Sequence, residues 1–198
     1  MGVPISPFTI SMRFEQTTFP TATDVVSLSS AKDHLRVSTS EDDALITALI
    51  TAAQDLVQKY TGTFLQRTSG TFYSDYFIDF MDLHAGPLLT VSSVKYTNTS
   101  DASITVSSND YQVDGKGYPA RLRMTTIPTD VKDVLNAVEV ATVSGYDTDD
   151  RPQALVSAML LIIGHLYENR QDVTRFKQFE IPMASKYLME PYRLKSFK

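Results

Sequence analysis

Histidine side chains are the first candidates for metal chemistry in this sequence, and their spacing argues against a metal centre. His34, His84 and His165 lie far apart, and no His-x-x-x-His pair places two of them on one face of a helix. A zinc site requires such side chains to converge at ligand distance. His165, near the end of an apolar segment, is therefore interpreted as a structural histidine. We expect no metal and no cofactor.

Two acidic clusters contain the residue types that bind Ca²⁺ or Mg²⁺. They lie at residues 41–43 and 147–150, and neither has the spacing of an EF-hand loop with its closing glutamate. Each cluster precedes a helical pattern, where negative charge interacts favourably with the helix dipole. Helix capping therefore explains both clusters better than cation binding.

The sequence lacks the common catalytic motifs. There is no cysteine, which excludes a thiol nucleophile and a disulfide framework, and no Gly-x-Ser-x-Gly, Gly-x-x-x-x-Gly-Lys-Ser/Thr or Gly-x-Gly-x-x-Gly pattern. The glycine-rich stretch at 114–117 lies between two strand-like segments and is typical of a hairpin turn. We therefore expect no catalytic residues, and the protein is predicted not to be an enzyme.

The charge of the chain is unevenly distributed. The net charge is −5, which argues against general affinity for nucleic acid, yet residues 170–198 hold seven basic and three acidic residues. This basic tail also carries large apolar and aromatic residues of the kinds that enrich protein interfaces. Two interpretations remain open: the tail folds back on its own core, or it docks into another chain.

Helical signals begin near residue 29 and continue to Gly62. Ser30 and Asp33 could form a capping box for a first helix at 29–36, and Ser40 could cap a second, longer helix. Gly62 is suited to end this helix in the left-handed conformation. The apolar positions of the second helix have the spacing of one buried stripe: Leu45, Ile46, Leu49, Ile50, Ala53, Leu56, Val57 and Tyr60.

From residue 64 to 146 the helical period disappears. β-branched and aromatic residues alternate with polar ones between turn signals, which predicts several short strands in an antiparallel sheet or small sandwich. The candidate strands are 71–77, 88–97, 103–106, 111–113, 121–125 and 137–143. Arg121 and Arg123, two positions apart, should share one face of their strand.

A third helix should start at Asp149, Asp150 and Pro152, because an acidic cap with an early proline is a start signal. It is apolar over most of its circumference, which predicts a central position, and a short helical segment follows at 184–188. Its longest apolar run, 154–163, has about half the ~20 residues of a membrane span. Residues 1–20 do not read as a signal peptide, so we expect a soluble protein made in the cytoplasm.

These elements predict an α+β fold with a β region inserted into a helical core. Residues 1–27 are interpreted as an extended N-terminal arm, 28–63 and 147–170 as the helical core, 64–146 as the inserted β region and 171–198 as the C-terminal tail.

A series of short motifs follows in a fixed order along the chain. They are Ala31-Lys32-x-His34-Leu35-Arg36, Asp42-Asp43-x-Leu45-Ile46-x-x-Leu49-Ile50-x-Ala52-Ala53, Tyr60-Thr61-Gly62, Gly145-Tyr146, Pro152-x-Ala154, the run 160–163, His165-Leu166-Tyr167-Glu168-Asn169-Arg170 and Leu188-Met189-x-Pro191-Tyr192-Arg193. In order and spacing this series resembles the head–tail connector, or adaptor, proteins of tailed bacteriophages and phage-derived particles. The resemblance runs from about residue 28 to 193 and matches the larger members with a β segment between the helices.

The resemblance implies a structural virion protein at the neck, which forms a ring, twelvefold in relatives, below the portal protein. Such a ring extends the DNA channel, offers a docking surface to a stopper or tail-completion protein, and lets DNA pass without specific binding; no membrane partner is expected. Its C-terminal segment would reach the portal, and the candidate contacts are Tyr187, Leu188, Tyr192 and Arg193. Candidate subunit contacts or structural pins are Glu41, Asp42, Asp43, Glu168 and Arg170.

Two other functions remain as alternatives. In the first, the β region belongs to another virion or carbohydrate-binding module and exposes a cluster of aromatic side chains. The candidate residues are Tyr73, Tyr76, Phe77 and Tyr96. The second alternative is a small metal-dependent hydrolase.

Overall fold

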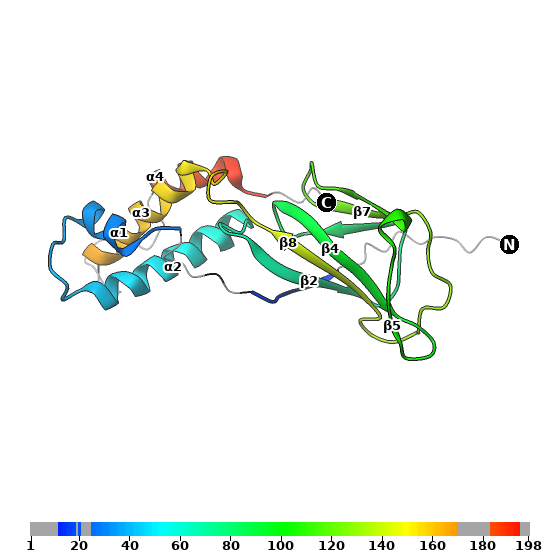
Figure 1. Ribbon diagram of the computed structural model, residues 1–198. Helices are drawn as coiled ribbons and strands as arrows, with labels where there is room; N and C mark the ends of the chain where they lie inside the picture. Colours follow the sequence, from blue (N-terminus) through cyan, green and yellow to red (C-terminus); the bar gives the residue numbers. More distant parts are fainter. Residues whose placement is uncertain (1–11, 19, 21–24, 170–182, 195–198) are drawn as a thin grey trace. The chain divides into compact units, whose positions relative to one another are not determined.

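The computed structural model describes residues 12–18, 20, 25–169 and 183–194. These residues form two compact units, each built from two stretches of the chain (Figure 1). The β unit contains the described residues up to Thr18 together with Ser69–Val143, and the helical unit contains the described residues of Phe19–Thr68 and Ser144–Lys198. The α+β prediction is confirmed.

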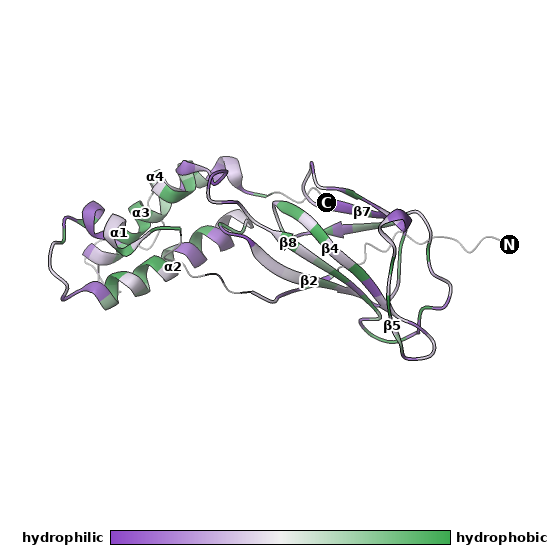
Figure 2. Cartoon of the chain, in the orientation of Figure 1, coloured by the Kyte–Doolittle hydropathy of each residue, from purple (hydrophilic) through white to green (hydrophobic). Residues whose placement is uncertain are grey.

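The described residues of the helical unit form four α-helices. They are α1 (Leu28–Leu35), α2 (Asp43–Thr61), α3 (Gln153–Glu168) and α4 (Met183–Met189), and a 3₁₀ turn, η3 (Glu190–Tyr192), follows directly. Helix α3 packs against α1, α2 and α4. Hydrophobic residues recur along α2 and α3 (Figure 2), and they meet in one buried cluster that includes Ile50, Leu155 and Ile162.

The helix starts differ from the predicted ones. Ser27, not Ser30, caps α1: its hydroxyl accepts a hydrogen bond from the Ser30 backbone N–H at 3.1 Å. Asp42 occupies the N-cap position of α2 and Pro152 that of α3, in both cases without a side-chain capping bond. Ser40 therefore does not cap α2, and Asp149 and Asp150 do not cap α3. Gly62 ends α2 with φ of 75°, as predicted.

The part of the β unit that the structure describes forms two sheets. The five-stranded sheet has the order β1-β2-β8-β4-β5, and the three-stranded sheet has the order β3-β7-β6. Their bounds are β1 Arg13–Gln16, β2 Thr68–Ser74, β3 Phe80–Leu83, β4 Leu88–Thr97, β5 Ser103–Thr105, β6 Tyr111–Asp114, β7 Ala120–Met124 and β8 Val138–Ser144, with a short 3₁₀ turn, η2, at Ser108–Asp110. Strands β1 and β3 are not among the predicted ones.

Register fixes which side chains of the β unit face solvent. In the three-stranded sheet Phe80 lies opposite Arg123 and Arg123 opposite Gln112, and β7 pairs antiparallel with both β3 and β6. Ala120, Leu122 and Met124 of β7 are buried while Arg121 and Arg123 are exposed, so the two arginines share one face as predicted. The described part of the chain contains no helix long and apolar enough to cross a membrane.

Candidate docking surfaces

The α4–η3 segment is anchored on the helical unit. Met189 is fully buried in the helical core, and the backbone N–H of Leu194 donates to the carbonyl of Thr61 at 2.7 Å. The Tyr60 hydroxyl donates to Glu190 Oε2 at 2.9 Å, and the Arg193 guanidinium lies 5.4 Å from the centre of the Tyr60 ring. The segment is thus held at its buried residues and leaves its other face to solvent.

The outer face of α4 is apolar. Met183 is 66% exposed and Tyr187 is 71% exposed. Because residues four apart lie on the same face of a helix, these two side chains form one surface patch. Of the predicted portal contacts, Tyr187 and Arg193 face solvent, whereas Leu188 and Tyr192 pack partly against the helical core.

The hydrogen bond from Tyr60 to Glu190 links the α4–η3 segment to the ionisation of the Tyr60 side chain. The bond to Glu190 raises the pKa of Tyr60 above its ordinary value, and burial and the negative charge of Glu190 add to the rise. The neutral phenol is the donor in this bond, so the contact is intact wherever Tyr60 is protonated.

The predicted acidic pins have partners inside their own chain. Lys32 Nζ lies 2.6 Å from Asp43 Oδ1, and the Tyr167 hydroxyl donates to Asp42 Oδ2 at 2.5 Å. These contacts tie α1, α2 and α3 together at one end of the helical unit. Glu41 and Glu168 are exposed. Arg170 lies outside the described residues.

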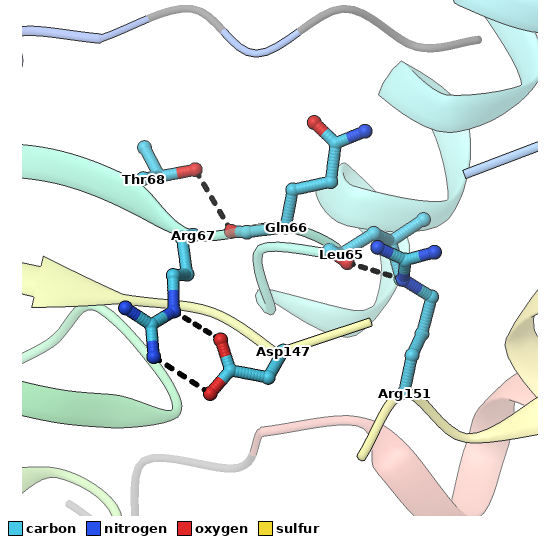
Figure 3. Close-up of polar contacts among 6 residues, drawn as sticks. All are labelled: Leu65, Gln66, Arg67, Thr68, Asp147 and Arg151. Atoms are coloured by element: carbon cyan, nitrogen blue, oxygen red, sulfur yellow. Dashed lines mark hydrogen bonds and ion pairs between the residues drawn. The ribbon is translucent and has the colours of Figure 1, made fainter. Parts of the chain in front are cut away.

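A second polar cluster lies where β2 and the segment before α3 meet (Figure 3). Arg67 binds Asp147 through Nε and through Nη2, the latter at 2.8 Å from Oδ2, and this bidentate pair lowers the pKa of Asp147 and raises that of Arg67. Arg151 Nε donates to the Leu65 carbonyl at 2.6 Å. The arrangement fixes the segment before β2 against the segment before α3, and the Asp147 carboxylate is occupied by the Arg67 guanidinium.

Gly145 allows the segment around Gln66 and the segment before α3 to approach each other closely. Its φ is +111°, and a side chain there would collide with the backbone carbonyl oxygen of Gln66. Only glycine satisfies both the backbone angle and the close approach.

The histidines do not converge. His165 lies in α3 with Asn169 Nδ2 at 3.3 Å from its Nδ1, His34 lies in α1 beside Gly164, and the His84 ring meets the edge of Tyr118. No group of three or more potential metal ligands occurs among the described residues.

The aromatic cluster proposed for a carbohydrate-binding module is not a surface cluster. Phe77 and Tyr96 are buried, their ring centres lie 5.8 Å apart, and the Tyr96 hydroxyl donates to Asp130 at 2.8 Å. Tyr73 is half-buried beneath Arg13, which leaves only Tyr76 well exposed. Phe77 lies after the end of β2, although the predicted strand 71–77 included it, and Tyr96 lies on β4; both rings are turned into the core.

The exposed side of the three-stranded sheet combines arginine with an aromatic ring. Arg121 Nη2 lies 3.0 Å from Asp114 Oδ2, and this hydrogen bond lowers the pKa of Asp114. The Arg123 guanidinium lies 5.4 Å from the centre of the exposed Phe80 ring. The paired arginines were visible in the sequence, whereas Phe80 was missed because β3 is short and gives no alternation.

Comparisons with known proteins find a family model and several solved structures that are similar to this chain. Residues 25–115 match the family model described as phage gp6-like head-tail connector protein. A chain in the solved neck of an empty gene transfer agent particle, computed with C6 symmetry, is similar with a TM-score of 0.77 and 19% identity. This match covers 94% of the present chain and 98% of the other.

Two further solved structures agree with the first. A chain of the native gene transfer agent virion has a TM-score of 0.74 and 19% identity, and a chain of the native neck computed with C12 symmetry has 0.70 and 18%. Each covers 94% of the present chain and 98% of the matched one. A comparison with curated protein sequences finds no match. The predicted resemblance to head–tail connectors is confirmed.

Proposed function

Because residues 25–115 match the phage gp6-like head-tail connector family, we propose that this protein is a structural, non-enzymatic component of the neck of a phage or phage-derived particle. The observation that carries the proposal is this match together with a fold similarity that extends over 94% of the chain. The chain would act as an adaptor between the portal protein and the stopper or tail-completion protein.

A ring is the assembly that this role requires. The similar chains come from necks computed with sixfold and twelvefold symmetry, which supports a closed ring, and we expect a dodecamer. A ring below the portal would extend the DNA channel. The net charge of −5 suits a lumen through which DNA passes without binding, because like charge repels the phosphate backbone.

The outer face of α4 is the best candidate for the portal contact. Met183 and Tyr187 expose apolar surface on a helix whose opposite side is anchored through Met189. An exposed tyrosine on a rigid support loses little conformational entropy on binding. Arg193, stacked on Tyr60, extends this surface by a positive charge.

The experiment is electron microscopy of particles from a strain that lacks this gene. Filled or leaking heads beside unattached tails are the expected result, and rescue by the intact gene is the control. Complete, tailed particles in the absence of the gene would overturn the proposal.

The portal contact is tested in the same strain with Tyr187→Glu and, as its matched control, Tyr187→Phe. We expect Tyr187→Glu to reduce tailed particles roughly tenfold or more, because it brings a charge into a contact that excludes water. Tyr187→Phe keeps the aromatic side chain and should rescue assembly. Equal rescue by both variants would remove Tyr187 from the portal contact and leave the neck role intact.

A further inference from the structure

The loop between β7 and β8 presents an apolar tip. Leu135 is 81% exposed and Val134 is also exposed. Tyr76, half exposed, comes from the segment after β2, which is joined to this loop where the Asn136 backbone N–H donates to Asp75 Oδ1 at 2.8 Å. We call Tyr76, Val134 and Leu135 the apolar tip.

The apolar tip is held in place from both sides. The Lys132 N–H donates to the Thr97 carbonyl and the Thr99 N–H donates to the Asp130 carbonyl, both at 2.9 Å, and Lys132 forms an ion pair with Asp101. Asn136 completes the turn with a positive φ of 57°. A loop fixed in this way exposes Leu135 without conformational freedom to lose on binding, which favours a docking role.

The rim of the apolar tip is acidic. Asp75 and Asp133 are exposed beside it, and the charge of Lys132 is matched by Asp101. An apolar centre with a charged rim is the usual composition of a protein interface. Its partner should therefore offer an aromatic or apolar surface with a positive charge.

The three-stranded sheet of the same unit has such a surface. Phe80 is 52% exposed, Arg123 stacks on it, and Gln112 lies beside Arg123 in register; we call these three residues the arginine face. Asp114 neutralises Arg121, whereas Arg123 forms no ion pair with any residue in the described part of the chain. The arginine face thus offers an aromatic ring and a positive charge.

From this complementarity we propose that the apolar tip of one copy docks on the arginine face of the next copy. The two surfaces lie on different sheets, the apolar tip at the β4–β5 end of the five-stranded sheet and the arginine face on the three-stranded one. Such a contact is heterologous, and a heterologous contact that closes generates a ring. The inference rests on the proposed neck function and names the surfaces that build its ring.

Cysteine cross-linking tests the contact, because the natural chain contains no cysteine and gives no background. Particles would be made with the full chain carrying Leu135→Cys and Phe80→Cys together, or either change alone, and treated with a bis-maleimide. The double variant should give a ladder of covalent oligomers, while each single variant should stay a monomer. Dimers from a single variant would indicate a symmetric contact between identical surfaces. Assembled necks in which the double variant stays monomeric would exclude a contact between the apolar tip and the arginine face. Either result overturns the inference.

Charge exchange provides a second, independent test in the strain that lacks the gene. We expect Asp133→Arg or Arg123→Glu alone to reduce tailed particles roughly tenfold, because like charges would meet across the contact. Both changes in one chain should restore assembly at least partly, since every contact in the ring then carries the exchanged pair. Asp149→Arg and Lys59→Glu, exposed positions of the helical unit, are the matched controls.

The outcomes separate this inference from the proposed function. If particles without the gene are complete, the neck role fails and the contact has no ring to build. If the gene is required but the single charge variants assemble like the natural chain, or the exchanged pair gives no rescue, only the tip-to-face contact fails.

Discussion

The helical unit and the β unit distribute their apolar side chains in opposite ways. The helices share one continuous core, and outside α4 they expose no large apolar side chain among the described residues. The β unit has a buried core of its own but also leaves large apolar residues in solvent: Tyr76, Phe80, Leu89, Val113, Ile127, Val134 and Leu135. The comparison suggests that one unit is built for stability and the other, with α4, for contacts with other chains.

The largest expected difference in stability is between truncating a buried apolar residue of the helical unit and truncating an exposed one of the β unit. Ile50→Ala should destabilise the helical unit by about 2–5 kcal/mol, because Ile50 is fully buried and its loss leaves a cavity. Leu135→Ala should change stability by less than about 0.5 kcal/mol, because Leu135 already contacts solvent. Urea unfolding followed by circular dichroism measures both. Equal effects would contradict the division of roles.

A glycine substitution in each unit sharpens the comparison. Gly145→Ala should cost about 1–3 kcal/mol, because alanine at φ of +111° is strained and would meet the Gln66 carbonyl. Gly117→Ala is the matched control in the β unit, where nothing lies within 4 Å of the added carbon. Thermal unfolding of the two variants should rank them clearly. A Gly145→Ala protein as stable as the control would show that the segments around Gly145 and Gln66 can move apart freely.

The polar contacts between the helices should contribute less. Tyr167→Phe removes the donor to Asp42 and should destabilise the helical unit by about 1 kcal/mol. Tyr187→Phe, on the exposed face of α4, should leave stability unchanged and serves as the control. Denaturant titration of both variants provides the measurement, and an unchanged Tyr167→Phe midpoint would argue against a structural role for that bond.

The smallest effect is a pH dependence that both units should share. Ion pairs lower the pKa of Asp147 in the helical unit and of Asp114 in the β unit below their ordinary value of 3.8. Their stabilisation is therefore full above that value and is lost as the pH falls through the lowered pKa.

Asp147→Asn and Asp114→Asn should each weaken the acid-induced loss of stability. Asp149→Asn, whose carboxylate has no ion pair among the described residues, is the control. Acid titrations of unfolding midpoints measure the effect. A steeper acid dependence in either ion-pair variant would reverse the expected sign.

Sequence reasoning succeeded where periodicity and local signals decide structure. The apolar stripe of α2, the left-handed Gly62 and the bounds of β4 follow from residue types alone. It failed where pairing over long distances decides: β1 has no marked apolar alternation and is a strand because β2 lies beside it. The shift of the α1 cap from Ser30 to Ser27 has a local cause, since the two serines are equally good capping residues by type.

The candidate contacts show the same limit. The acidic residues at the start of α2 were predicted to be subunit contacts or structural pins, and within the chain Lys32 and Tyr167 bind Asp43 and Asp42. Neither partner is adjacent in sequence, so charge patterning could not identify them. Conversely, nothing in the stretch around Leu135 predicts exposure, which depends on how the loop is anchored to Asp75 and Thr97.

The division of each unit between two stretches of chain determines the order in which the protein can mature on the ribosome. The described part of the β unit is fully translated once Val143 has left the tunnel, whereas the helical core still lacks α3 and the buried Met189. Synthesis thus supplies the apolar tip with Leu135 and the arginine face with Phe80 before the α4 surface. A nascent chain interrupted before α3 would leave the apolar side chains of α1 and α2 uncovered, which would mark it for chaperones before it could enter an assembly.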